Sequence, residues 1–198
     1  PLRRQRQMCI RDSHQFDGSR LMDVKVMGTL GISEENLTAL RKLKNVQSVE
    51  GGHSVDVIAR KQGSDEEHAI KVMGKTDKLN QITIIDGKLP QASGECLVDE
   101  WYAQQNDLKT GDVLNLSSGN EDDLKDTLKD TTYKITGIGS SSEYLSRSRG
   151  STGIGTGTLS GFIVVQPSEF SSDIYTEVYL TAKGAKQERA YSLSLIHI

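Results

Sequence analysis

The groups best able to do chemistry in this sequence include a glycine-rich run at Gly150–Gly161. Its glycines lie at 150, 153, 155, 157 and 161, a density that invites a phosphate-binding interpretation. A Walker loop ends in Gly-Lys-Ser/Thr, whose lysine contacts the phosphates, and no lysine lies in this run. The dinucleotide pattern fails as well, because Ser160 stands at the third glycine position. The composition therefore predicts a flexible surface loop.

Nucleophilic chemistry would need a cysteine or serine with a base. Cys96 with His53 or His68 is the one thiol–imidazole combination to consider in the body of the chain. Cys96 precedes Leu97-Val98 in a short apolar run, where cysteine usually acts as a small buried residue. The stretch at 52–56, G-H-S-V-D, lacks the closing glycine of a nucleophile elbow. We therefore predict no catalytic residue, no cofactor and no enzymatic activity.

Metal binding is not indicated either. Cys9 and Cys96 are far apart without C-x-x-C spacing, which supports neither a zinc site nor a disulfide framework. The acidic residues of the 121–130 stretch lack the alternating oxygen ligands and the glycine of a calcium loop. Lysines are interleaved with them, and the pattern predicts a solvated face. The acidic residues are Glu121, Asp122, Asp123, Asp126 and Asp130.

Charge and hydropathy exclude two further classes of partner. The formal net charge is −3, and the basic residues of the first thirteen positions leave an even more acidic body. A body without a clustered basic face lacks the electrostatic footprint of nucleic-acid binding. The longest apolar run, Phe162–Val165, is far shorter than the ~20 residues of a membrane helix, and no signal-peptide core appears. We expect the chain as given to be water-soluble.

The two ends read differently from the body. Residues 4–13, R-Q-R-Q-M-C-I-R-D-S, and residues 192–198, S-L-S-L-I-H-I, resemble peptides translated from sequencing-adapter DNA. A disordered basic arm and a frayed apolar tail are the ordinary alternative. We favour the artefact because both ends show it, and predict a body of 14–191 between foreign or disordered residues 1–13 and 192–198. The natural protein then continues beyond both ends.

The first half of the body reads as one helix among strands. Ser33 is a candidate N-cap, followed by acids in the first turn and by leucines three residues apart at 37, 40 and 43. A turn is predicted at 29–32, and Gly51-Gly52 is expected to separate two strands. The order β-α-β-β-β predicts a helix packed on one face of a sheet, an α+β arrangement. Its strands are expected at 22–27, 46–49, 55–58 and 68–73.

The second half is richer in strands. Two short strands flank a Gly-x-x-Pro corner at Gly87–Pro90, and Asp99 is expected to cap a short helix at 99–107. A polar surface loop is predicted at 117–130 and a helical turn at 168–170. Strands are expected at 82–85, 95–98, 113–116, 133–138, 162–165 and 176–181.

Laid out in order, these segments resemble the extracellular domain of FtsX-like ABC transporter permeases, related to the MacB periplasmic core domain. The resemblance covers about 14–191. It is carried by D-V-K-V-M at 23–27, V-E-G-G-H-S-V-D at 49–56, D-G-K-L-P at 86–90, G-E-C-L-V-D at 94–99, L-K-T-G-D-V-L at 108–114, Y-K-I-T-G-I at 133–138, R-G-S-T-G-I-G-T-G-T-L-S-G-F-I-V-V at 149–165 and Y-T-E-V-Y-L-T at 175–181. Membrane helices and a stalk segment after Tyr191 are missing from the pattern.

The resemblance implies a MacB-like α+β fold with two parts. A porter-like part would combine the N-terminal β-α-β region with the last strands, and a β-rich subdomain would be inserted into it. It also implies a domain on the extracellular or periplasmic side of the cell membrane, in a membrane-embedded, dimeric parent. A separate ATP-binding subunit would supply energy, while this domain transmits motion and contacts an unknown substrate or partner protein. The alternative is a free-standing secreted or surface binding protein of the same fold, with a hydrolase a distant third.

The working surface is predicted at Gly139–Ser160. A stretch this long without a secondary-structure pattern is uncommon in a compact domain and is usually functional or disordered. Tyr144 and Leu145 offer an apolar anchor, and Arg147 and Arg149 add positive charge to an acidic body. Tyrosine and arginine are enriched among binding hot spots, so these four residues form the candidate partner-contact loop. A passive connector is the alternative.

Overall fold

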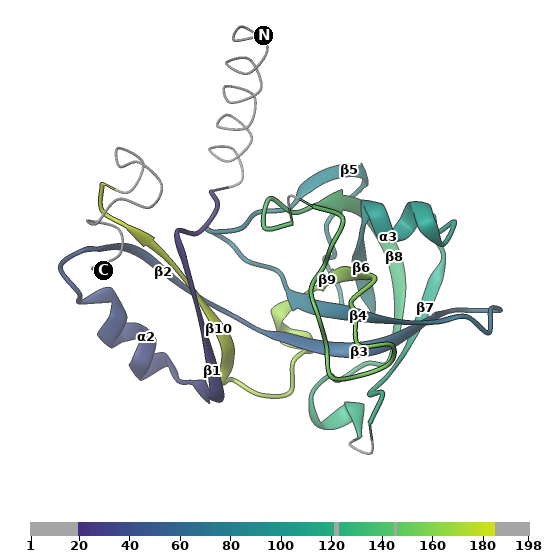
Figure 1. Cartoon of the computed structure of the whole chain (residues 1–198), viewed down its shortest axis with the longest axis horizontal. Helices are drawn as coiled ribbons and strands as arrows, with labels where there is room; N and C mark the ends of the chain where they lie inside the picture. The colour runs from purple at the N-terminus through teal and green to yellow at the C-terminus, as the bar shows by residue number, and fades with distance from the viewer. Residues whose placement is uncertain (1–19, 121–122, 145, 185–198) are drawn as a thin grey trace, which may run out of the picture. The chain divides into compact units, whose positions relative to one another are not determined.

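The computed structural model describes residues 20–120, 123–144 and 146–184, which form two compact units. The terminal unit consists of residues 22–53 and the chain from residue 173, and the inserted unit consists mainly of residues 54–172. Each has its own sheet and hydrophobic core, and helices and strands together make the chain α+β (Figure 1). Within the described ranges, no helix is long and apolar enough to cross a membrane. A likeness of the terminal unit to porter domains stays a prediction.

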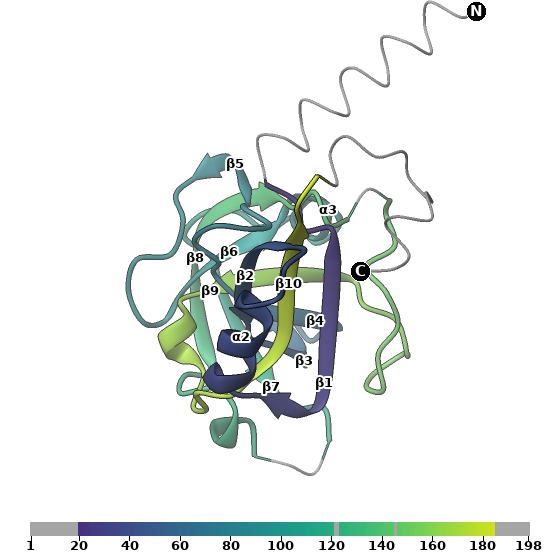
Figure 2. The same ribbon diagram turned by 90° about the vertical axis from the view of Figure 1, so that its left-hand side faces the viewer.

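The terminal unit is a three-stranded antiparallel sheet covered by one helix. Its elements are β1 (Val24–Ile32), α2 (Glu34–Arg41), β2 (Val46–Gly52) and β10 (Tyr175–Ala182). The strand order is β1-β10-β2, so the last strand of the chain is the central one. The helix lies over β2 and β10 on one face (Figure 2). There its Leu37 is buried with the apolar residues Ile32, Val46, Val49 and Val178.

The start of α2 confirms the predicted cap. The Ser33 hydroxyl oxygen accepts a hydrogen bond from the Asn36 backbone amide, and the Ser33 amide donates to Asn36 Oδ1 over 3.1 Å. This reciprocal capping box satisfies amide groups that the helix itself cannot pair.

The inserted unit is built on a ring of six strands. Its strands are β3 (Ser54–Lys61), β4 (Glu67–Gly74), β5 (Thr83–Gly87), β6 (Glu95–Asp99), β7 (Val113–Ser117), β8 (Thr132–Ser140) and β9 (Gly161–Val165). They pair in the order β5-β8-β6-β9-β4-β3-β7, and β7 also pairs with β8. That extra pairing closes the six strands from β8 to β7 into a ring. The remaining strand, β5, pairs with the second half of β8, on the edge whose first half pairs with β7.

Side chains pointing into the ring form the largest core. Along β8 the buried residues alternate, beginning with Tyr133 and Ile135, as the sequence predicts for a half-buried strand. The short helix α3 (Glu100–Gln105) adds Tyr102 and Ala103 to the same core. Leu124 of the 3₁₀ turn η1 (Leu124–Asp126) and Phe170, which follows the 3₁₀ turn η2 (Pro167–Glu169), belong to the same core. The core residues from the ring strands are Val57, Ala59, Ile70, Val72, Cys96, Val98, Leu114, Leu116, Tyr133, Ile135, Ile163 and Val165.

Two predicted breaks in the terminal unit are wrong. The turn expected at 29–32 lies within β1, which passes through an irregularity after Met27 and resumes pairing at Ile32 opposite Tyr175. Gly51 and Gly52 are the last two residues of β2, so the break between β2 and β3 falls at His53 and not at the glycines. They lie against the rings of Tyr175 and Tyr179, where a Cβ atom would collide with ring carbons. Glycine is needed there for packing, so the pair does not mark the gap between the two strands.

Gly161 provides a test of how tightly α3 packs on the ring. A Cβ atom at this position would collide with Cβ of Tyr102, so α3 must shift in Gly161→Ala. We expect a loss of about 1–3 kcal/mol in the free energy of unfolding, measured by urea denaturation. Gly153→Ala is the matched control, because no atom lies within 4 Å of its added methyl group. Equal stability of the two variants would contradict the packing described here.

Candidate functional site

The predicted contact loop joins β8 to β9, and it has two parts. Ser140 ends β8, so residues 141–160 form the connection; Leu145 lies outside the described residues. The glycine-rich part is a small hairpin with a bridge between Ser151 and Thr158. Ile154 and Leu159 pack it against Ile58 and Ala69 of β3 and β4. This part of the loop lies on the surface as predicted, and Ile154 and Leu159 attach it to the two strands.

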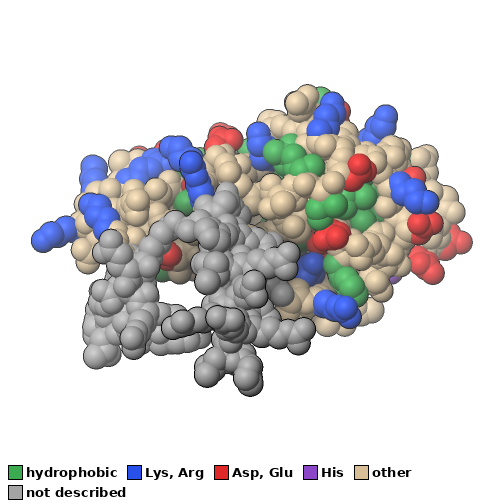
Figure 3. Space-filling model, turned by 90° about the horizontal axis from the view of Figure 1, so that it is seen from above, with side chains coloured by type: hydrophobic (Ala, Val, Ile, Leu, Met, Phe, Trp, Pro, Cys, Tyr) green, Lys and Arg blue, Asp and Glu red, His purple; other side chains and the backbone are tan. Residues whose placement is uncertain are grey.

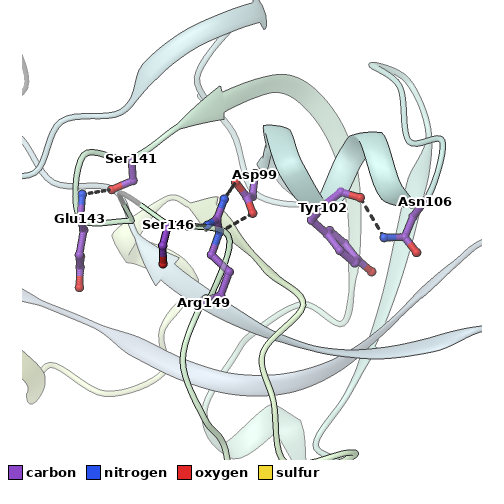
Figure 4. A network of polar contacts seen from close by, with 7 residues as sticks. All are labelled: Asp99, Tyr102, Asn106, Ser141, Glu143, Ser146 and Arg149. Atoms are coloured by element: carbon purple, nitrogen blue, oxygen red, sulfur yellow. Dashed lines mark hydrogen bonds and ion pairs between the residues drawn. The ribbon is translucent and has the colours of Figure 1, made fainter. Parts of the chain in front are cut away.

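Arg149 fixes the other part of the loop, residues 141–150, to the ring. Its Nε donates to Asp99 Oδ2 over 2.8 Å and its Nη2 donates to Asp99 Oδ1 over 3.0 Å (Figure 4). Its Nη1 donates to the carbonyl oxygen of Ser146 in the same loop. The side chains of Arg149 and Asp99 are only 8% and 1% exposed. Arg149 is therefore a buried structural residue, whereas the sequence predicted an available positive charge.

Asp99 corrects a second expectation. It stands at the N-cap position of α3, as predicted, but its side chain makes no capping hydrogen bond. Both carboxylate oxygens are engaged by Arg149. A buried carboxylate is stable only with a charged or hydrogen-bonding partner, and the planar guanidinium supplies two parallel bonds. The ion pair therefore replaces the cap, and joins the end of β6 to the loop.

Aromatic rings support the arginines of the loop. The Arg149 guanidinium carbon lies 5.2 Å from the centroid of the Tyr144 ring, which stacks on Phe162 of β9 with centroids 5.3 Å apart. The Arg147 guanidinium carbon lies 4.4 Å from the centroid of the Trp101 ring of α3. Both arrangements are within the distance of a cation–π interaction. Tyr144 is half-buried, so Arg147 is the exposed member among the described residues of the predicted set.

Sequence reasoning missed Trp101 and the turn that begins the loop. Trp101 is the single tryptophan of the chain and follows Asp99 by two residues, which was the available signal. The turn is formed by Ser141, whose hydroxyl accepts from the Glu143 amide (Figure 4) and whose carbonyl oxygen accepts from the Tyr144 amide. These bonds fix the backbone at the start of the loop. The Arg147 side chain therefore lies on the Trp101 ring of α3 from a fixed position.

The Cys96 thiol and the imidazoles of His53 and His68 each have other neighbours. Cys96 is fully buried in the ring core, and burial raises the pKa of its thiol above the ordinary value. Because the thiolate is the nucleophilic form, this cysteine is a poor nucleophile at neutral pH. His68 lies edge-on to Tyr102, and His53 lies against Tyr175 in the terminal unit. Among the described residues, no group of three or more His, Cys, Asp or Glu side chains suits a metal ion.

One polar cluster is built around a buried carboxylate. Glu169 is 1% exposed and accepts hydrogen bonds from the Ser93 and Tyr133 hydroxyls over 2.7 and 3.0 Å. Burial, together with the nearby Glu169 charge, raises the pKa of Tyr133. Ser93 Oγ also lies 2.8 Å from Asp130 Oδ2. Asp130 is half-buried, whereas Asp123 and Asp126 of the predicted solvated face are exposed. The cluster ties η2 to the turn before β6.

No other candidate site stands out on the face of the described residues that Figure 3 shows, which is the molecule of Figure 1 viewed from above. On the inserted unit, hydrophobic side chains lie there in small groups among charged side chains (Figure 3). Among the described residues of this unit, the exposed large apolar side chains are Ile84 and Ile85 of β5, at 43% and 50%. The loop with Arg147 and Trp101 therefore remains the candidate contact site.

Comparison with known proteins gives a structural match without a sequence match. No protein-family model matches the chain, and no curated protein matches its sequence. A domain of a protein described as a permease from Porphyromonas gingivalis is similar with a TM-score of 0.50 at 11% identity, over 84% of this chain and 76% of that one. At this identity the match shows the fold alone, and at that level it confirms the resemblance predicted from the sequence.

Two further structures are similar over most of both chains. The extracellular domain of the noncanonic ABC-type transporter YknZ from Gram-positive bacteria matches with a TM-score of 0.49 and 14% identity, over 81% of this chain and 78% of that one. The periplasmic region of MacB from Actinobacillus actinomycetemcomitans matches with a TM-score of 0.45 and 8% identity, over 87% and 71%.

The structural role of Arg149 can be tested against Arg147. Arg149→Ala leaves the Asp99 carboxylate buried without its charged partner, so we expect a loss of about 3–5 kcal/mol in the free energy of unfolding. Arg147→Ala removes an exposed cation–π contact, for which about 0.5–1 kcal/mol is expected. Both values come from urea denaturation. Adding Asp99→Asn to Arg149→Ala should recover part of the loss, because the unpaired charge disappears; no recovery would contradict this explanation.

Proposed function

We propose that this chain is the part of an ABC transporter permease that lies outside the membrane, on the extracellular or periplasmic side. It has no catalytic activity of its own, and a separate ATP-binding subunit supplies the energy. The domain transmits motion between the membrane-embedded part of a dimeric parent and an external substrate or partner protein. The permease-domain fold supports this proposal.

The observation that carries the proposal is the place where the chain enters and leaves the terminal unit. The first residue of β1, Val24, pairs with Leu180 near the end of β10. Paired strands lie about 5 Å apart, whereas packed helices lie about 8–10 Å apart. A few residues are enough to span that difference. Two neighbouring membrane helices could therefore continue directly into β1 and out of β10.

The second part of the proposal concerns the contact loop. Tyr144, Leu145, Arg147 and Arg149 belong to one loop, in which Arg149 and Tyr144 form the base. Arg147 is exposed on Trp101 and is available to a partner. Because the buried ion pair already holds the loop, little conformational entropy is lost when a partner binds. We propose that Arg147 and Trp101 form the contact surface for the external substrate or partner.

The location can be tested by labelling one exposed position in the parent permease. Leu30 is 95% exposed, whereas Cys96 is fully buried, so Cys96 gives little background. In the parent permease with its other exposed cysteines replaced by serine, Leu30→Cys should react with a membrane-impermeant maleimide in intact cells, or in spheroplasts if an outer membrane is present. The protein with Cys96 alone is the control. Labelling that occurs only after lysis would refute the proposed location.

The contact surface can be tested in the same parent protein. We expect Trp101→Ala/Arg147→Ala to lower transport, or signalling through the permease, by about ten-fold, as for the loss of one binding hot spot. Lys109→Ala is the matched control, because Lys109 is an exposed lysine paired with the exposed Asp107. Unfolding of the purified domains checks that both variants fold. Unchanged transport in the double variant would leave the loop as a passive connector.

A further inference from the structure

The chain enters the terminal unit at β1 and leaves it after β10. A force that pulls these two segments apart acts on the strand pair in its mechanically weak direction. The strands are antiparallel, with the start of β1 beside the end of β10. A force that separates the two chain segments at this end loads the ladder hydrogen bonds one after another. Sequential loading opens a strand pair more easily than simultaneous loading of all its bonds. A domain that transmits motion through these strands therefore needs reinforcement at this end.

Asp23 supplies reinforcement at the end of the ladder. Its backbone amide donates to the Leu180 carbonyl oxygen over 2.9 Å, and its Oδ2 accepts from the Ala182 amide over 2.8 Å. The carboxylate therefore bonds β10 beyond Leu180, the partner of the first β1 residue. A hydrogen bond to a charged acceptor is stronger than a neutral one.

A second connection lies one step further along the ladder. Lys25 Nζ of β1 is 2.8 Å from Glu177 Oε2 of β10, and the Tyr179 hydroxyl donates to the same oxygen over 2.7 Å. Glu177 is fully buried. Removing Lys25 from a buried carboxylate is strongly unfavourable, so this pair resists separation after the Asp23 bonds.

The opposite edge of β10 is held independently. The Lys183 amide donates to the Asn45 carbonyl oxygen over 2.9 Å, and Lys183 Nζ donates to the Lys44 carbonyl oxygen over 3.0 Å. These bonds join the end of β10 to the segment before β2. When the end of the sheet opens, β10 stays with β2, and β1 is the strand that separates.

We propose that Asp23 and the Lys25–Glu177 pair form a latch that prevents β1 from peeling off β10. With the latch closed, a displacement of the two chain segments moves the whole three-stranded sheet. Without the latch, the same displacement would only separate β1 from β10 locally. This role rests on the proposed function, but the latch itself is a property of the isolated chain.

Hydrogen exchange on the full chain tests the latch directly. Asp23→Ala should increase amide exchange in β1 and at Ala182 by about ten-fold or more, the factor that corresponds to loss of a bond to a charged acceptor. Exchange in the inserted unit should not change. Asp23→Asn keeps a carbonyl acceptor without the charge, so its exchange should lie between the wild type and Asp23→Ala. Asp173→Ala, which removes an exposed carboxylate beside the opposite end of β10, is the matched control.

A second variant and a mechanical measurement complete the test. Lys25→Met keeps the length of the side chain, and its β1 amides should also exchange at least about ten-fold faster. With handles at the two ends of the chain, single-molecule pulling should open both latch variants at a lower force than the wild type. Unchanged β1 exchange and unchanged opening force in folded Asp23→Ala and Lys25→Met proteins would overturn the latch.

The parent permease separates the latch from the proposed function. A disulfide between Val24→Cys and Leu180→Cys joins directly paired positions, and should restore transport lost in Asp23→Ala. Failure of this rescue, with faster β1 exchange already measured, would reject transmission through β1 and β10 while leaving the latch as a structural feature. Failure of external labelling at Leu30→Cys would reject the proposed location regardless of the latch.

Discussion

The terminal unit depends on the central place of β10 between β1 and β2. Val178 completes the core under α2 with Val46 and Val49, although more than a hundred residues separate β10 from β2 in sequence. The first 30 or so described residues can therefore bury their apolar face only when the chain has returned from the inserted unit. The inserted unit, which lies between these two parts of the sequence, forms its own closed six-stranded ring. Long-range pairing of this kind carries a loop-closure cost that a pre-folded insertion reduces.

Buried carboxylates occur where distant segments must meet in one arrangement. Asp99 bonds Arg149, Glu169 bonds Ser93 and Tyr133, and Glu177 bonds Lys25 and Tyr179. Desolvation offsets much of the attraction in such pairs, so well-packed apolar residues could stabilise the fold as much, whereas loss of one partner alone costs about 3–5 kcal/mol. A competing arrangement that buries the carboxylate without its partner is much less stable, however. These groups therefore serve mainly to specify which loop or strand lies where, and the Asp99 pair does so for the contact loop.

Local features could be predicted from the sequence, and features that depend on distant partners could not. The Ser33 cap and the alternating strand at Tyr133 were predicted because neighbouring residues determine them. The loop at 117–130 was predicted to lie on the surface, yet its Leu124 and Leu128 are buried in the ring core. Gly51-Gly52 was misread because a glycine at a turn and a glycine under an aromatic ring look alike in sequence. The parallel pairing of β4 with β9 has no local signal, since it depends on the closure of the ring.

Arg147 and Arg149 show why a site assigned by composition has to be re-examined residue by residue. The two are identical in type and two positions apart, and both were predicted to offer positive charge. Arg149 is committed to Asp99, fifty residues earlier in the chain, whereas Arg147 lies exposed on Trp101. The difference comes from what each side chain meets, namely the buried end of β6 or the outer face of α3. Once Arg149 is paired, the backbone on both sides of Arg147 is held, and the exposed guanidinium is presented on a rigid aromatic ring. The contact surface is thus a consequence of the buried ion pair beneath it.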